Sequence, residues 1–131
     1  MLNTETDKRF CAAETLSVFD QVLRLVLYED GDAFLEILDV TWEYLNGDPV
    51  KFNAIVDSEA RVTFGQGWDG AITSDLVDDG IRGALLGRLS GGERLDIRLP
   101  NRSRVAQFSL DGAADAIAAT EDCWAALRAQ D

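Results

Sequence analysis

The sequence predicts an α+β fold: a mainly antiparallel β-sheet, sandwich-like or curled, with a short helix near 79–89 and a C-terminal helix near 112–128. Three observations indicate it. Alternating apolar and polar residues, interrupted by turn sequences, run through much of 17–68 and again through 93–109. Apolar residues at helical spacing follow residue 79. An alanine-rich segment of helical spacing closes the chain.

A single domain accounts for the whole chain, 1–131. Its 14.4 kDa and 47% hydrophobic content are enough to build one core. It has no proline-rich or serine-rich linker and no internal repeat. Residues 1–8 are polar, and we expect them to fray.

The first predicted element is a β-hairpin over 17–40. Asp30-Gly31 is a strong turn signal between two runs of alternating residues. In the first run Leu23, Leu25 and Leu27 share one face, and Arg24 lies on the other. The same apolar residues also fit a period near 3.6, so a helix over 16–28 is the alternative.

Further strands are expected over 42–45, 50–56 and 61–68. The turn sequence Asn46-Gly47-Asp48-Pro49 separates the first two of these strands. In the third, Gly65 and Gly67 favour a bulge or a close approach of another backbone segment.

The short helix begins after Asp78 or Asp79, either of which suits the N-cap, and ends at Gly91-Gly92. Its apolar face comprises Ile81, Leu85, Leu86 and Leu89. Two strands, 93–100 and 101–110, follow and should pair with each other. The last helix is predicted to have Asp111 as its N-cap and a stripe on one face formed by Ile117, Thr120, Trp124 and Leu127.

Charge and composition exclude several classes of function. Twelve basic and 24 acidic residues give a net charge of −12, which disfavours direct binding to nucleic acid and to anionic lipid surfaces. No apolar run reaches the roughly 18 to 20 residues that cross a bilayer. Without histidine, Ser-His-Asp and Cys-His catalysis are excluded. Carboxylate chemistry, an oxygen-ligand metal site, or a lysine or serine nucleophile remains open to an enzyme, but the sequence contains no recognisable catalytic motif. We therefore expect no enzyme, no metal and no cofactor, and a protein as the partner. A carboxylate-dependent enzyme is the third hypothesis.

The candidate binding surface is the loop that runs from Gly65 to Asp79. Trp68 is flanked by glycines, which favours an exposed position on a loop. The carboxylates that accompany it are Asp69, Asp75, Asp78 and Asp79. These acids suit either a docking surface, a calcium site, or turn formation and helix capping. The aromatic residues Trp42, Tyr44, Phe64 and Trp68 suit either the core or an exposed docking face.

The two cysteines lie near opposite ends of the chain. Cys11 begins a potential edge strand, and Cys123 borders the apolar stripe of the last helix. A bond between them would fasten the first ordered element to the last and would indicate an oxidising compartment. The alternative is two unrelated buried cysteines in a cytosolic protein.

The C-terminal half is similar to small exported bacterial proteins of the invasion-associated locus B type. The similarity lies in a strand, a Ser-Leu-x-Gly turn and an alanine-rich helix that ends in cysteine, formed by Phe108, Ser109, Leu110, Gly112, Ala116, Ile117 and Cys123. The resemblance implies a β-rich periplasmic domain, a cysteine bridge and no known catalysis. The chain departs from the family at residues 1–10, which do not form a secretory signal, so either it is cytosolic or Met1 was added to a mature exported chain.

Together these features predict a non-enzymatic exported, periplasmic or secreted, binding or accessory domain. The alternative is a cytosolic acidic protein of the inhibitor or immunity type, which would block a basic surface of a partner protein.

Overall fold

The computed structural model describes residues 9–17, 20–44, 47–76, 78–99 and 104–129, without the side chains of Asp79 and Arg104. The helices and strands are, in order, β1 (Phe10–Leu16), β2 (Val22–Tyr28), β3 (Ala33–Leu38), β4 (Asp48–Val56), β5 (Glu59–Trp68), β6 (Ala71–Asp75), α1 (Asp79–Gly91), β7 (Arg94–Arg98), β8 (Arg104–Ser109) and α2 (Ala113–Arg128). The strands form one antiparallel sheet in the order β1-β2-β3-β6-β5-β4-β7-β8. The predicted α+β fold is confirmed.

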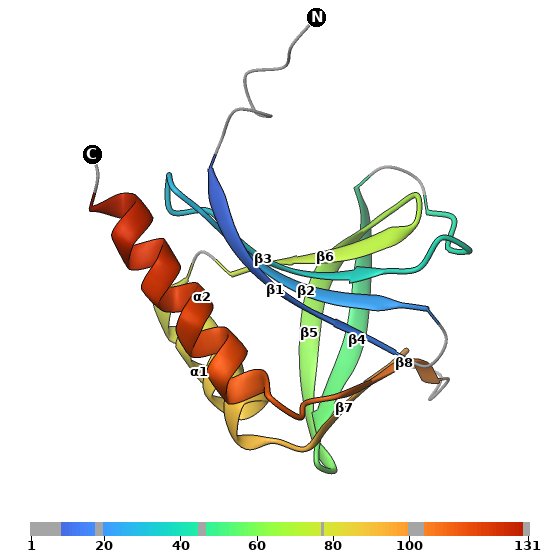
Figure 1. Cartoon of the computed structure of the whole chain (residues 1–131). Helices are drawn as coiled ribbons and strands as arrows, with labels where there is room; N and C mark the ends of the chain where they lie inside the picture. Colours follow the sequence, from blue (N-terminus) through green and yellow to red (C-terminus); the bar gives the residue numbers. More distant parts are fainter. Residues whose placement is uncertain (1–8, 18–19, 45–46, 77, 100–103, 130–131) are drawn as a thin grey trace, which may run out of the picture.

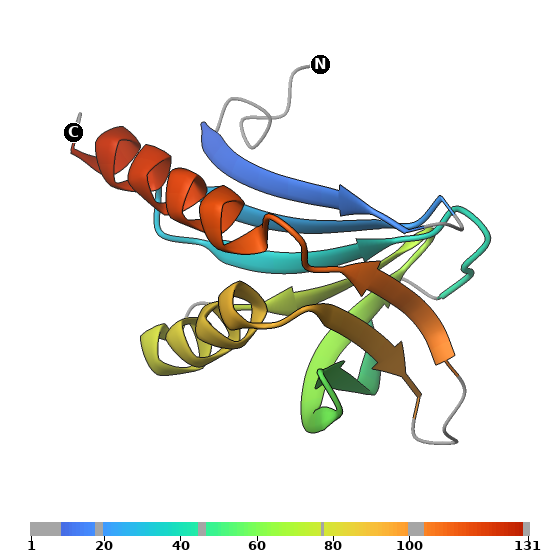
Figure 2. The same cartoon turned by 60° about the horizontal axis from the view of Figure 1, so that its bottom comes forward.

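The sheet curls until its two end strands, β1 and β8, come into contact, and both helices cover the concave side (Figures 1 and 2). The core lies on this concave side. It is built from the inward-facing residues of the strands together with Leu76, Leu86, Leu89, Leu110 and Ile117. Helix α2 packs on β1, β2 and α1. The convex face of the sheet is therefore the side on which the described helices do not lie.

A buried polar side chain links the two ends of the curled sheet. Gln21 lies just before β2, and its Nε2 donates hydrogen bonds to the carbonyl of Val105 on β8 (2.6 Å) and to Asp39 Oδ2 (2.8 Å). Burial alone would raise the pKa of Asp39. Hydrogen bonds from Thr41 and Gln21 outweigh that effect and hold the pKa below its ordinary value of 3.8. Asp39 therefore stays ionised at neutral pH and orients the Gln21 amide.

The hairpin predicted for 17–40 is confirmed as β2 and β3, and the alternative helix over 16–28 is wrong. The strand predicted over 42–45 is wrong for residues 42–44, which are not in a strand, and Tyr44 packs on Gly67 instead; Leu45 lies outside the described residues. Strand β4 pairs with β5 across the two-residue turn Asp57-Ser58. Strand β6 was not predicted.

Both predicted helices are confirmed, with one correction. Asp78 caps α1, since its Oδ1 accepts a hydrogen bond from the backbone N–H of Ile81. At α2, however, the N-cap is Gly112 and not Asp111. Gly112 has a φ of 78°, a conformation that glycine adopts at little cost, and it lets the chain turn sharply from β8 into the helix.

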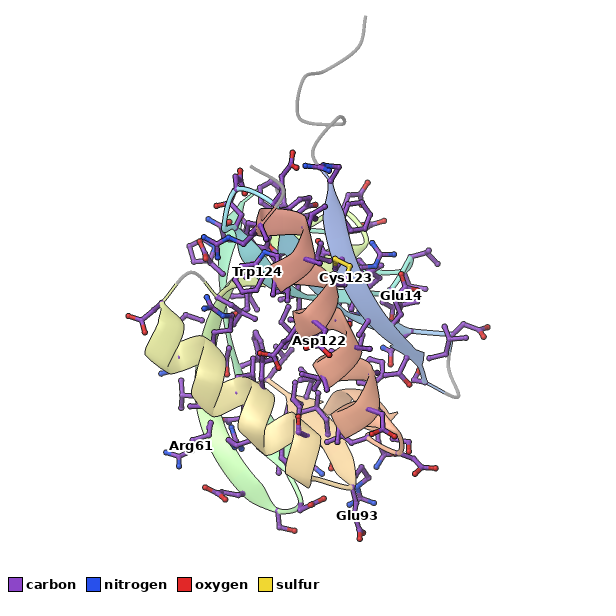
Figure 3. All side chains as sticks on the ribbon, turned by 60° about the vertical axis from the view of Figure 1, so that its left-hand side comes forward. Glu14, Arg61, Glu93, Asp122, Cys123 and Trp124 are labelled. Carbon is purple, nitrogen blue, oxygen red and sulfur yellow. A yellow bond between two sulfur atoms is a disulfide. The ribbon has the colours of Figure 1, made fainter. Side chains whose placement is uncertain are left out.

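Helix α2 is fixed to the sheet by two neighbouring residues, Cys123 and Trp124 (Figure 3). Cys123 forms a disulfide with Cys11 of β1, which confirms the link between the first and last elements. The indole Nε1 of Trp124 donates to the Tyr28 carbonyl (2.7 Å). The guanidinium carbons of Arg82 and Arg128 lie 5.0 and 4.9 Å from the centre of the indole. Neither described helix is long and apolar enough to cross a membrane.

Candidate docking surface

The residues predicted for the binding surface lie in two separate places. Trp68 ends β5, and Asp69 lies in the adjoining turn. Asp75 and Asp78 follow at the other end of β6, and five strand residues span roughly 17 Å. Asp79 is the first residue of α1, and its side chain is not among those that the structure describes. Among the described residues, no three acidic or cysteine side chains come close enough to hold a metal ion.

Trp68 is not the exposed loop residue that the sequence suggested. It is half-buried, its Nε1 donates to Thr73 Oγ1 (2.8 Å), and its ring lies beside Gly47. The glycines near it allow close packing. A Cβ at Gly65 would stand 2.6 Å from the Thr73 carbonyl oxygen, and one at Gly67 would overlap the ring of Tyr44. Trp68 thus helps to hold β5 and β6 together.

The exposed aromatic residue of this region is Phe64, on the convex face of β5. Phe64 is 71% exposed. It lines a shallow groove of about 230 Å³ between β3, β6 and β5. The groove is lined by Phe34, Phe64, Gly65, Gln66, Thr73 and Asp75. Of the predicted site residues, only Asp75 belongs to it.

The strand register explains why the groove forms here. Phe34 on β3 lies directly opposite Asp75 on β6, and Gln66 on β5 lies opposite Thr73. Strand β6 pairs with β3 as far as Asp75, but its pairing with β5 ends at Thr73. The two strands separate beyond that point. The separation leaves a hollow between the rings of Phe34 and Phe64.

A row of aromatic rings leads across the convex face to this groove. The centroids of Phe10 and Tyr28 are 5.6 Å apart, and those of Tyr28 and Phe34 are 6.2 Å apart, with tilted and edge-on geometry. Phe10 is largely exposed. The row therefore gives the convex face a strip of accessible aromatic surface across β1, β2 and β3.

Carboxylates border this aromatic strip. On the same face, Arg24 Nε lies 2.9 Å from Glu14 Oε1, and Arg24 Nη1 lies 3.4 Å from Glu36 Oε1. Burial raises the pKa of Glu36, and the guanidinium of Arg24 opposes that shift. Two carboxylates, those of Glu14 and Glu36, therefore share the single guanidinium of Arg24. Asp75 is a third acidic residue, at the groove. On the other side of Phe64, Lys51 is its cross-strand neighbour on β4.

A second hollow, of about 120 Å³, lies beneath the start of α2. Its interior is apolar and includes Leu25, Leu35, Leu110 and Ile117. Its lining also includes Glu14, Ser109 and Asp111, and no aromatic ring lines it. The groove at Phe64 is therefore the better candidate for recognition.

Comparison of the chain with protein-family models, curated proteins and solved structures finds no match.

Proposed function

We propose that this chain is an exported, non-enzymatic binding domain that recognises a basic, partly apolar segment of another protein. The observation that carries the proposal is the exposed ring of Phe64, which faces a groove that also contains Phe34 and Asp75. Large exposed aromatic residues next to a hollow are typical of residues that dominate protein interfaces. The convex face offers such a residue on strand β5.

The chemistry of the groove selects the kind of segment. The rings of Phe34 and Phe64 suit the aliphatic part of a lysine or arginine side chain, and Asp75 suits its charged end. The net charge of −12 attracts basic partners over a distance and speeds their encounter. Both effects favour a partner with positive charges among apolar residues.

Export is supported by the disulfide between Cys11 and Cys123. Bonds of this kind persist mainly in oxidising compartments. We expect protein isolated from its natural source under non-reducing, thiol-blocking conditions to have no free thiol when its mass is measured. Free thiols on both cysteines would contradict export and would favour the alternative, a cytosolic acidic inhibitor of a basic protein.

Phe64→Ala tests the docking surface. The probe is a short peptide of alternating lysine and valine residues, and we expect the substitution to weaken its binding about tenfold, as truncation of a dominant aromatic residue does. Calorimetry measures the affinity. The control is Leu16→Ala, which truncates an equally exposed side chain far from the groove and should leave affinity unchanged. Equal binding by Phe64→Ala and the wild type would overturn the assignment, as would equal binding of a glutamate and valine peptide.

A further inference from the structure

Strand β5 has a partner strand along only one of its two edges for most of its length. Residues 59–67 of this strand, all but Trp68, pair with β4. On the other edge only Gln66–Trp68 pair with β6. Within the described residues, no strand pairs with 59–65 on that side. An unpaired strand edge presents backbone groups that another strand can bind.

The register shows which backbone groups face this open edge. Asp57 and Ser58 have φ values of 49° and 74° and form a two-residue hairpin turn, so Val56 and Glu59 are a hydrogen-bonded pair. Odd-numbered residues of β5 therefore bond to β4, and even-numbered residues face away from it. Ser74 confirms this direction, since its Oγ donates to the Phe64 carbonyl from the β6 side (3.0 Å).

A side chain occupies one end of the open edge and leaves the rest of it accessible. Ser74 Oγ donates to the Phe64 carbonyl at that end. Arg88 of α1 donates to the Glu59 carbonyl (2.7 Å), which belongs to an odd-numbered residue and faces β4. The N–H and C=O groups of Ala60 and Val62 face the open edge. Both residues are exposed, Val62 by 55%.

The open edge lies on the projecting hairpin of β4 and β5 (Figures 1 and 2). In Figure 3 the labelled side chain of Arg61, the residue between Ala60 and Val62, extends from the surface below α1. Arg61 is bonded to its neighbour Glu59 (3.1 Å), and both side chains are largely exposed. An incoming strand thus meets a hairpin arm that solvent reaches on both faces.

We propose that the partner's segment binds by strand addition: it lies in extended form along the open edge of β5 and pairs with the backbone of Ala60 and Val62. This inference rests on the proposed function and adds its mode of binding. Alternate side chains of the added strand would continue the convex face beside Val62 and Phe64, so the same segment reaches the groove. A second copy of this chain is a poorer occupant, because each copy carries a charge of −12.

Val62→Pro tests strand addition with Val62→Ala as its matched control. Proline removes the N–H that faces the open edge and does not affect the hydrogen bonds that odd-numbered residues make to β4. The loss of a backbone bond together with the bulk of the ring should weaken binding of the lysine and valine peptide about tenfold relative to Val62→Ala. Equal affinity of the two variants would overturn strand addition.

Two further measurements keep the test decisive. If Val62→Pro fails to fold, the wild-type domain is titrated with two forms of the same peptide, one with N-methyl groups on its valines and the other with N-methyl groups on its lysines. Alternate N–H groups of an added strand face β5, so strand addition requires that at least one of the two forms loses its affinity. Unchanged affinity of both forms would overturn it. Sedimentation of the wild type alone should show a monomer. If it shows a dimer, and Val62→Pro abolishes that dimer, then the strand that binds the open edge comes from a second copy of this chain and not from a partner protein. If Phe64→Ala weakens peptide binding and Val62→Pro does not, the groove at Phe64 remains the docking surface, and only the proposal of binding by strand addition is rejected.

Discussion

Replacing both cysteines, as Cys11→Ala/Cys123→Ala, is expected to lower the free energy of unfolding by about 2–4 kcal/mol. The bond joins residues 112 positions apart in the sequence. It therefore restricts nearly the whole unfolded chain, and loop-closure entropy for about 100 residues sets an upper value near 4.7 kcal/mol. Small domains are stable by only about 5–15 kcal/mol, so this loss is a large share of the total.

The bond also has a local role, because it holds an end strand. Strand β1 pairs only with β2, and its other edge lies at the seam next to β8. Helix α2 packs over β1, and the disulfide joins the buried Cys11 to this helix. Without it, the amides of Phe10–Leu16 should exchange with solvent faster than those of the central strand β4.

Urea unfolding monitored by circular dichroism measures the effect. The oxidised wild type, the wild type in dithiothreitol and the double variant are compared under one set of conditions. We expect the reduced wild type and the double variant to unfold at similar, lower urea concentrations, and dithiothreitol to have no effect on the double variant. A double variant as stable as the oxidised wild type would show that the bond contributes nothing to stability.

The elements that the sequence predicted correctly are those with a local signal. The β2–β3 hairpin could be predicted because Asp30-Gly31 separates two runs of alternating residues. Helix α1 could be predicted because Asp78 precedes apolar residues at helical spacing. Strand β6 was missed because it is short and its residues Ala71–Asp75 alternate only weakly. Its pairing with β3 is a long-range contact, which no local pattern reveals.

Long-range contacts also explain why the sequence favoured Trp68 over Phe64 as the exposed binding residue. The neighbouring glycines suggested a loop, but in the structure Gly65 packs closely on the Thr73 carbonyl and Gly67 packs closely on Tyr44. Alternation does place Val62 and Phe64 on one face of β5. That this face is the convex one, without a helix above it, follows only from the curl of the sheet and the placement of α1 and α2 on the opposite side. Exposure of Phe64 is a property of the tertiary fold.

The hairpin that presents the open edge takes its core side chains from β4, while β5 is tied to β6 only at its end, over Gln66–Trp68. On the concave side β4 buries Val50, Phe52, Ala54 and Val56 in the core. Strand β5 has Gly67 as its only buried residue. The stability of the whole hairpin, and with it the position of Val62 and Phe64, therefore depends on the core residues of the neighbouring strand.

Phe52→Ala is accordingly expected to cost about 3–5 kcal/mol in the free energy of unfolding, the usual range for truncating a fully buried phenylalanine. Phe52 is 1% exposed and pairs across the hairpin with Thr63. Val62→Ala, in the same hairpin but on its exposed side, is the control and should change stability by less than about 0.5 kcal/mol. Urea unfolding of both variants gives the comparison. Similar losses for the two would mean that β5 is held by its own side chains, and the account of the hairpin as an arm carried by β4 would be wrong.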